Sequence, residues 1–239
     1  MNYYLIVGVI FLISIVINMI LKKKLRKYSK VKLKLNINGE EIAKKMLEDH
    51  GIYNLNIITT KGDPCNNYYD PINRTIHLSE EVFYQTNITS VSIATHESAH
   101  AIQHQYGYNL LKLRNNMVPI LNFSSKWTNI LIMLGITLFY ISGGRSTIVL
   151  QLGIFGFFLM FLFSLITLPV EFDASKRALD WVKKNNHIVK YNDISKIECG
   201  LRWASLTYVI STIGYLSQLM YFISIFKNTL DTNEYGRDD

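Results

Sequence analysis

Apolar residues are gathered into long blocks along this chain. The uncharged blocks lie at residues 3–21, 128–142, 147–168 and 203–226. A helix of about 20 apolar residues spans the hydrocarbon core of a bilayer, so the pattern predicts an α-helical membrane protein with about four transmembrane helices. The block 203–226 also contains Ser, Thr, Gln and Tyr, and an amphipathic helix packed on the other helices is the alternative there.

The block 3–21 is predicted to be an uncleaved anchor. A secretory signal peptide has basic residues before its apolar stretch and small residues at a cleavage site after it. Here the basic run KKKLRKYSKVKLK follows the block, at 22–34, and no such cleavage site is present.

In residues 28–127 the apolar positions recur at the short spacings of amphipathic helices and strands, which predicts a small α+β unit. Asn38 precedes an amphipathic helix over 38–51, which Gly51 ends. Residues 55–60 and 74–79 alternate like strands, and the residues between them are rich in turn formers. We expect 74–79 to be an edge strand, on which an extended peptide substrate would pair through its main chain.

Two helices are predicted after these strands. A short one begins after Ser79, and a longer one is capped by Thr89 or Ser90 and ends at Gly107. This unit is too small to bury a large core by itself, so we expect it to pack on the chain's own apolar helices.

Basic residues predict the orientation of the chain in the membrane. They are frequent in 22–34 and in 169–202, and the positive-inside rule places both segments in the cytoplasm. The predicted order is therefore a cytoplasmic unit at 28–127, a transmembrane hairpin at 128–168, a cytoplasmic helical segment at 169–202 and the span or bundle helix at 203–226. Both termini, including the acidic tail 227–239, then lie outside.

The net charge of +7 fits this topology and contact with the lipid bilayer. A nucleic-acid partner is not indicated, because no basic surface interleaved with aromatic residues and no known binding motif is present. Cys65 and Cys199 lie in predicted cytoplasmic segments, where thiols stay reduced.

The stretch THESAHAIQHQYG at 95–107 contains an HExxH motif. On a helix, His96 and His100 project from one face one turn apart, so both imidazoles can bind one zinc ion. Glu97 then lies beside the open position of the metal, where it can take a proton from water and pass it to the leaving amine of a peptide. A polar helix face with hydrogen-bonded histidines is the alternative.

A catalytic zinc site usually has three protein ligands, so a third must come from elsewhere in the chain. Glu171 is the leading candidate, because it follows the apolar block 147–168 at the membrane face. A charged side chain there is costly to bury and usually has a functional role. Since Pro169 suits a first helical turn, an acidic residue at a helix N-terminus is the alternative interpretation. For His104 we favour a role at the rim of a cleft, or no role, over metal binding.

Several segments together resemble a known family. HESAHAIQHQYGY, NYYDPINRTIHLSEEVF, LKLRNNMVPILNF and LPVEFDASKRAL are similar to the YugP-type membrane-embedded neutral zinc metallopeptidases of bacteria. The resemblance covers most of 38–226. It implies a zincin-like unit with Zn²⁺ bound by His96, His100 and Glu171, with Glu97 as the catalytic carboxylate.

A more distant similarity is to the HtpX and CAAX-protease type. In that type an aspartate four residues after the ligand glutamate orients a ligand histidine. Here Ser175 occupies this position, and Asp173, two residues after Glu171, points elsewhere on a helix. The partner of each ligand histidine is therefore open.

The group that would stabilise the oxyanion is also open. The candidate hydrogen-bond donors are Tyr69, Tyr106, His104 and His187. For Tyr69 and Asp70 a structural role in the turn before 74–79 is favoured.

These observations predict a zinc-dependent endopeptidase in the cytoplasmic membrane. Its active site would face the cytoplasm and hydrolyse peptide bonds in membrane-associated or unfolded proteins. The alternative is a non-catalytic membrane scaffold or regulator that binds the metal as a structural clamp; His104 as a fourth ligand would favour it.

Overall fold

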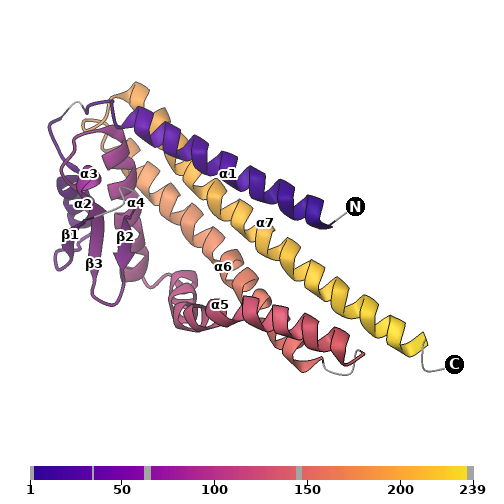
Figure 1. The fold of residues 1–239 in the computed structure, drawn as a ribbon. Coiled ribbons are helices and arrows are strands. Elements are labelled where there is room, and N and C mark those ends of the chain that lie inside the picture. Colours follow the sequence, from indigo (N-terminus) through magenta and orange to yellow (C-terminus); the bar gives the residue numbers. More distant parts are fainter. Residues whose placement is uncertain (1–2, 34, 62–65, 144–146, 236–239) are drawn as a thin grey trace. The chain divides into compact units, whose positions relative to one another are not determined.

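The computed structural model describes residues 3–33, 35–61, 66–143 and 147–235 (Figure 1). Contacts divide the chain into two compact units. The helical unit comprises Met1–Ile15, Leu113–Thr167 and Tyr208–Asp239, and the α+β unit comprises Val16–Lys112 and Leu168–Thr207. Cys65 lies outside the described residues.

The helical unit is formed by parts of four long helices. These are α1 (Tyr3–Tyr28), α5 (Asn109–Ile141), α6 (Ile148–Lys184) and α7 (Tyr191–Tyr235). Helices α5 and α6 approach closely at Gly135, where a Cβ atom would lie 2.5 Å from the Cα of Leu150. Small residues at such crossings are typical of helices that pack within a membrane. Between α6 and α7, the hydroxyls of Ser164 and Thr212 share a hydrogen bond of 2.6 Å.

Two helices among the described residues are long and apolar enough to cross a membrane: α6, and α7 over Tyr191–Lys227. They contain the predicted spans 147–168 and 203–226. The described residues do not support the predicted count of four spans. Helix α5 is not one of these two helices. Its apolar block 128–142 is short, and the half of the helix before it is more polar. The side chains of some residues in the predicted anchor 3–21 lie outside the described part of the chain.

The α+β unit begins with α2 (Gly39–Glu48). The side chain of Asn38 accepts a hydrogen bond from the backbone N–H of Glu41, and the Glu41 side chain accepts one from the Asn38 N–H. This reciprocal pair confirms the predicted start of the helix at Asn38. Gly51 follows the helix with a φ of +72°, a conformation that favours glycine.

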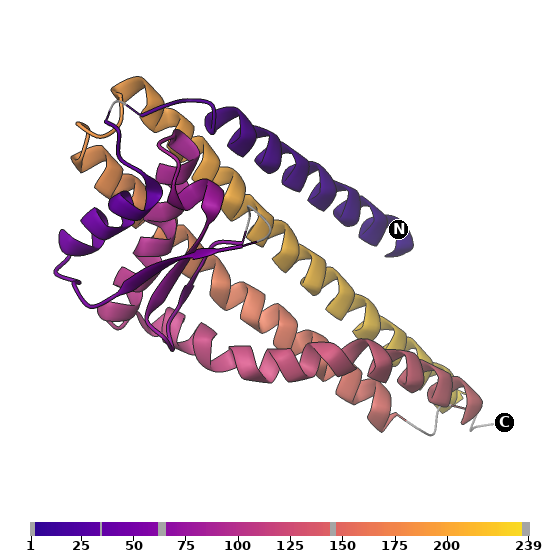
Figure 2. The ribbon, with the colours of Figure 1, turned by 60° about the vertical axis from the view of Figure 1, so that its left-hand side comes forward.

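Three strands form a small sheet, shown side by side in Figure 2. They are β1 (Asn56–Thr60), β2 (Tyr68–Asp70) and β3 (Thr75–Ser79), in the order β1-β3-β2. Strand β3 pairs in parallel with β1 and antiparallel with β2. The prediction that 74–79 is an edge strand is therefore wrong, because both sides of β3 are paired. The edges are β1 and β2, and β2 lies in a segment for which the sequence indicated turns and no strand.

Helices α3 (Glu80–Phe83) and α4 (Ile88–Gln105) follow the sheet. Helix α4 is capped by Asn87, whose side chain accepts a hydrogen bond from the N–H of Ser90. The predicted cap at Thr89 or Ser90 is therefore wrong, since both residues already lie within the helix. The buried core of the unit includes apolar residues of α4: Val91, Ala94, Ala99 and Ile102.

Helix α6 continues through Pro169 without a break. Up to Thr167 it belongs to the helical unit, and from Leu168 it belongs to the α+β unit. Glu171 is thus in the interior of a long helix, and its interpretation as a helix N-terminus is wrong. Helix α6 therefore belongs in part to each unit, and Glu171 belongs to the unit that contains the HExxH helix.

Candidate metal centre

Helix α4 presents the two motif histidines on one face. The ring centroids of His96 and His100 lie 4.9 Å apart, with their planes nearly perpendicular at 84°. Their side chains are 14% and 8% exposed, so both are largely withdrawn from water. The apolar residues on the other faces of α4 fix the helix in the core and hold these rings in place.

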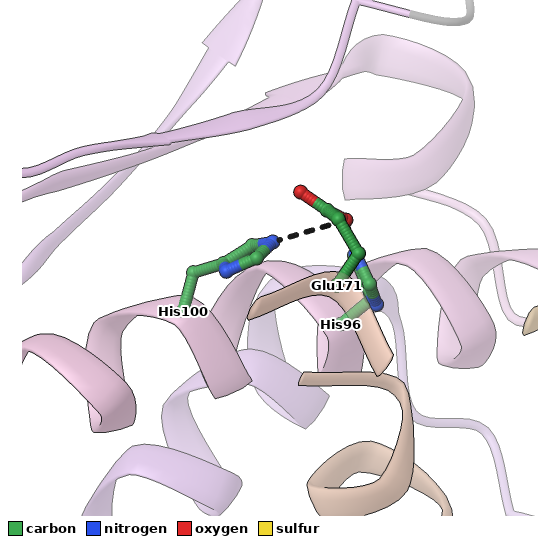
Figure 3. Close-up of side chains that lie close together, drawn as sticks. All are labelled: His96, His100 and Glu171. Carbon is green, nitrogen blue, oxygen red and sulfur yellow. Dashed lines mark hydrogen bonds and ion pairs between the residues drawn. The ribbon is translucent and has the colours of Figure 1, made fainter. Parts of the chain in front are cut away.

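Glu171 reaches the same point from α6 (Figure 3). Its Oε2 atom lies 3.2 Å from Nε2 of His96 and 3.6 Å from Nε2 of His100. Its side chain is 2% exposed. Ligand atoms of the three residues lie within 4.8 Å of one another, and they form the metal-ligating cluster found among the described residues.

The donor set and its spacing fit zinc. Two imidazole nitrogens and one carboxylate are a common protein contribution to a catalytic zinc site, which leaves a fourth position open. Bonds of about 2.0–2.1 Å to a tetrahedral ion separate neighbouring donor atoms by about 3.3 Å. The two distances from Glu171 Oε2, 3.2 and 3.6 Å, lie close to this separation.

The Glu171 carboxyl is held in its ionised form. Burial by itself would raise its pKa, but the charge and hydrogen bonds of His100, followed by those of His96, outweigh burial and hold the pKa well below its ordinary value. The residue lies beyond the apolar block 147–168, in the α+β unit. A buried anion next to two imidazoles is suited to bind a cation.

The catalytic residue predicted by the motif, Glu97, directly follows His96 on α4. Its side chain belongs to the buried part of the unit, with the residue 8% exposed. Its position directly after His96 is the one that the HExxH motif requires of the general base.

The two histidines differ in the partner of their second ring nitrogen. Nδ1 of His96 lies 3.4 Å from the hydroxyl of Ser175, the residue four positions after Glu171. Nδ1 of His100 lies 3.0 Å from Oε1 of Gln103, which the sequence reasoning missed. The spacing of three residues between His100 and Gln103 was the available sign, because such residues are neighbours on a helix.

Asp173 contributes to this arrangement through Gln103. Its Oδ2 atom accepts hydrogen bonds from Nε2 of Gln103 at 2.8 Å and from Nε of Arg177 at 2.6 Å. The expectation that Asp173 does not itself take the place of the missing aspartate agrees with these contacts.

His104 is paired with Tyr69 of strand β2. The phenolic oxygen lies 2.7 Å from Nδ1 of His104. Burial raises the pKa of Tyr69 and lowers that of His104, which the nearby cations Arg74 and Lys112 lower further. At neutral pH the pair is therefore an uncharged phenol and an uncharged imidazole. His104 does not belong to the metal-ligating cluster of the described residues.

The other two predicted oxyanion candidates lie on the surface. Tyr106 is 62% exposed and follows the end of α4. His187 is exposed in the turn between α6 and α7. Asp70, in contrast, builds the turn between β2 and β3, where its carboxylate accepts hydrogen bonds from the N–H groups of Ile72 and Asn73.

The chain as a whole matches a known class of proteins. A family model described as "Putative neutral zinc metallopeptidase" matches residues 3–227, and the chain belongs to this family. One relative is a protein of Bacillus subtilis (strain 168) described as "Putative membrane protease YugP". The two are 36% identical over 212 residues, which cover 89% of this chain and 91% of the relative. No solved structure matches this chain.

Proposed function

We propose that this protein is a zinc-dependent endopeptidase. The observation that carries the proposal is that Oε2 of Glu171 on α6 lies 3.2 Å from Nε2 of His96 and 3.6 Å from Nε2 of His100, both on α4. His96 and Glu171 are 75 residues apart in the chain. Membership in a family of zinc metallopeptidases supports the same conclusion.

The three converging side chains would hold the ion through Nε2 of each histidine and the carboxylate of Glu171. When bound, zinc supplies Lewis acidity, which polarises a peptide carbonyl and makes a water molecule more acidic. Glu97 would accept a proton from the attacking water and later donate it to the leaving amine as the peptide bond breaks. The low exposure of the site keeps bulk water from competing for these groups.

We further propose that the enzyme acts at the cytoplasmic membrane on membrane-associated or unfolded proteins. The two helices able to cross a membrane support this location, and the relative described as a membrane protease supports the substrate class. The basic residues of 22–34 and 169–202 support an active site that faces the cytoplasm, because Val16–Lys112 and Leu168–Thr207 form the unit that contains the site.

Substitution Glu97→Gln tests the activity. The purified full chain in detergent should keep its zinc content, while cleavage of unfolded casein should fall by about 10²-fold or more, because general acid–base catalysis contributes about 10²–10⁴-fold. The matched control is Glu81→Gln, which makes the same change at an exposed position and should leave both quantities unchanged.

Equal cleavage by the wild type and Glu97→Gln would contradict the proposed role of Glu97. Zinc binding without cleavage in either protein would favour the non-catalytic scaffold.

A further inference from the structure

Gln103 is a fully buried polar residue that contacts both helices of the candidate metal centre, α4 and α6. It is 0% exposed. Its Oε1 atom lies 3.0 Å from Nδ1 of His100, and its Nε2 atom lies 2.9 Å from the backbone oxygen of Val170 and 2.8 Å from Oδ2 of Asp173. Each end of the amide therefore has partners.

The partners decide which way the amide faces. The backbone oxygen of Val170 accepts hydrogen bonds, and so does the carboxylate of Asp173, which Arg177 also contacts. The NH₂ group of Gln103 must face them, because only this end of the amide donates. Oε1 is left toward His100.

The orientation of the amide decides in turn which nitrogen of His100 carries the proton. Oε1 of Gln103 only accepts, so Nδ1 of His100 must be the N–H that donates to it. An imidazole that binds a metal ion is neutral, so with its proton on Nδ1 it has its lone pair on Nε2. Nε2 is the atom that lies 3.6 Å from Glu171 Oε2 and would bind the metal.

The same side chain holds the two helices together at the site. Val170 and Asp173 flank Glu171 on α6, while Gln103 and His100 lie on α4. Hydrogen bonds from one buried amide to both positions fix the stretch of α6 from which Glu171 projects.

We propose that Gln103 is the positioning residue of this metal centre: it sets the ring of His100 with Nε2 available to the ion and holds the Glu171 segment of α6 against α4. Asp173 and Arg177 orient its amide. The inference deepens the proposed function and rests on it, because it concerns the same metal.

His96 offers an internal comparison. The hydroxyl of Ser175 lies 3.4 Å from its Nδ1, a distance at which a hydrogen bond is weak. The loss of Ser175 should therefore affect the site less than the loss of Gln103.

Zinc affinity of the purified full chain, measured by competition with a chromophoric chelator, tests the inference. Gln103→Met keeps the length of the side chain and removes both hydrogen-bonding ends. The zinc dissociation constant should rise by about 10- to 100-fold, the range found when outer partners of ligand histidines are lost. Gln105→Met, the same change at an exposed site on the same helix, is the matched control and should bind zinc like the wild type.

A charge exchange separates positioning from packing. Gln103→Glu alone places a carboxylate against the carboxylate of Asp173 and should weaken zinc binding. Combined with Asp173→Asn, the new amide can donate to the new carboxylate, which still accepts from His100, so two of the three contacts return while the backbone oxygen of Val170 lacks its donor. The double variant should bind zinc about tenfold more tightly than Gln103→Glu. The visible spectrum of the cobalt-substituted protein should change in Gln103→Glu and return toward the wild-type spectrum in the double variant.

The outcomes are distinct. Wild-type affinity and an unchanged cobalt spectrum in Gln103→Met would overturn the inference. If Gln103→Met does not fold, the exchange decides: recovery in the double variant supports the inference, and equal weakness of the single and double variants overturns it. Failure of the wild type itself to bind zinc would instead overturn the proposed function.

Discussion

At the scale of single residues, the site is defined by atoms that face one another rather than by residue types alone. His96, His100 and His104 lie on successive turns of one helix, yet only the first two turn Nε2 toward Glu171. His104 instead has its Nδ1 atom 2.7 Å from the phenol of Tyr69. Proximity to the Glu171 carboxylate thus distinguishes His96 and His100 from His104, although the three histidines are evenly spaced along the helix.

Glu171→Gln should remove the charge that attracts the ion while nearly preserving the size of the side chain. Loss of the hydrogen-bond partner of a ligand histidine raises the zinc dissociation constant by about 10- to 100-fold. Glu171 would be a direct ligand, so its loss should raise the dissociation constant by more than that. Chelator competition measures it. Glu48→Gln, on the exposed end of α2, is the control.

Unfolding of Glu171→Gln, followed in the presence of chelator, reports whether the fold is kept. A folded variant that still binds zinc like the wild type would show that Glu171 is not a ligand.

At the scale of elements, the turn between β2 and β3 has its own electrostatic stabilisation. The side chain of Asn73 donates to the Asp70 carboxylate at 2.7 Å, and the N–H groups of Asn73 and Ile72 donate to it as well. The Asn73 side chain is the largest cause that lowers the pKa of Asp70; partial burial opposes it.

This lowered pKa predicts a pH-dependent effect of Asp70→Ala. A carboxyl whose pKa is lower in the folded state contributes stability above its unfolded pKa, about 3.9, and loses it as pH falls through the folded value. The variant should therefore unfold at a lower temperature than the wild type at pH 6. The difference should shrink below about pH 4.

Thermal unfolding at several pH values checks this prediction. A difference between the two proteins that is the same at pH 6 and at pH 3 would show that Asp70 acts through packing rather than through its charge.

At the scale of the whole molecule, the metal would join parts of the chain that are distant in sequence. Its ligands come from α4 and from the segment of α6 within Leu168–Thr207, both in the α+β unit. A ligand that binds only the folded state stabilises it by about 2.7 kcal/mol when its free concentration is 100 times the dissociation constant.

Removal of zinc with a chelator should therefore lower the unfolding temperature of the wild type. Trp181 is a suitable fluorescent reporter, because it is buried in the same unit and its indole N–H donates to Asp49. Glu171→Gln should show little further change on chelation. An unfolding temperature that is equal with and without zinc in the wild type would contradict a metal that links these helices.

Periodicity and motif spacing determined much of the local structure. The start of α2 at Asn38, the approximate ranges of β1 and β3, and the placement of HExxH on one helix could all be predicted, because each depends on neighbours within a few residues. Strand β2 could not be predicted, since three residues show no alternation and only pairing with β3 defines them. The central place of β3 likewise depends on β2.

The sequence by itself determined that His96 and His100 share a helix face and that an acidic residue follows an apolar block at Glu171. Tertiary structure decided that α6 runs on through Pro169 and brings this carboxylate to the two imidazoles. It also decided that the amide of Gln103 meets Val170 and Asp173 of α6. Local spacing fixes which side chains share one helix face, but contacts between α4 and α6 depend on how buried surfaces far apart in the chain pack against each other.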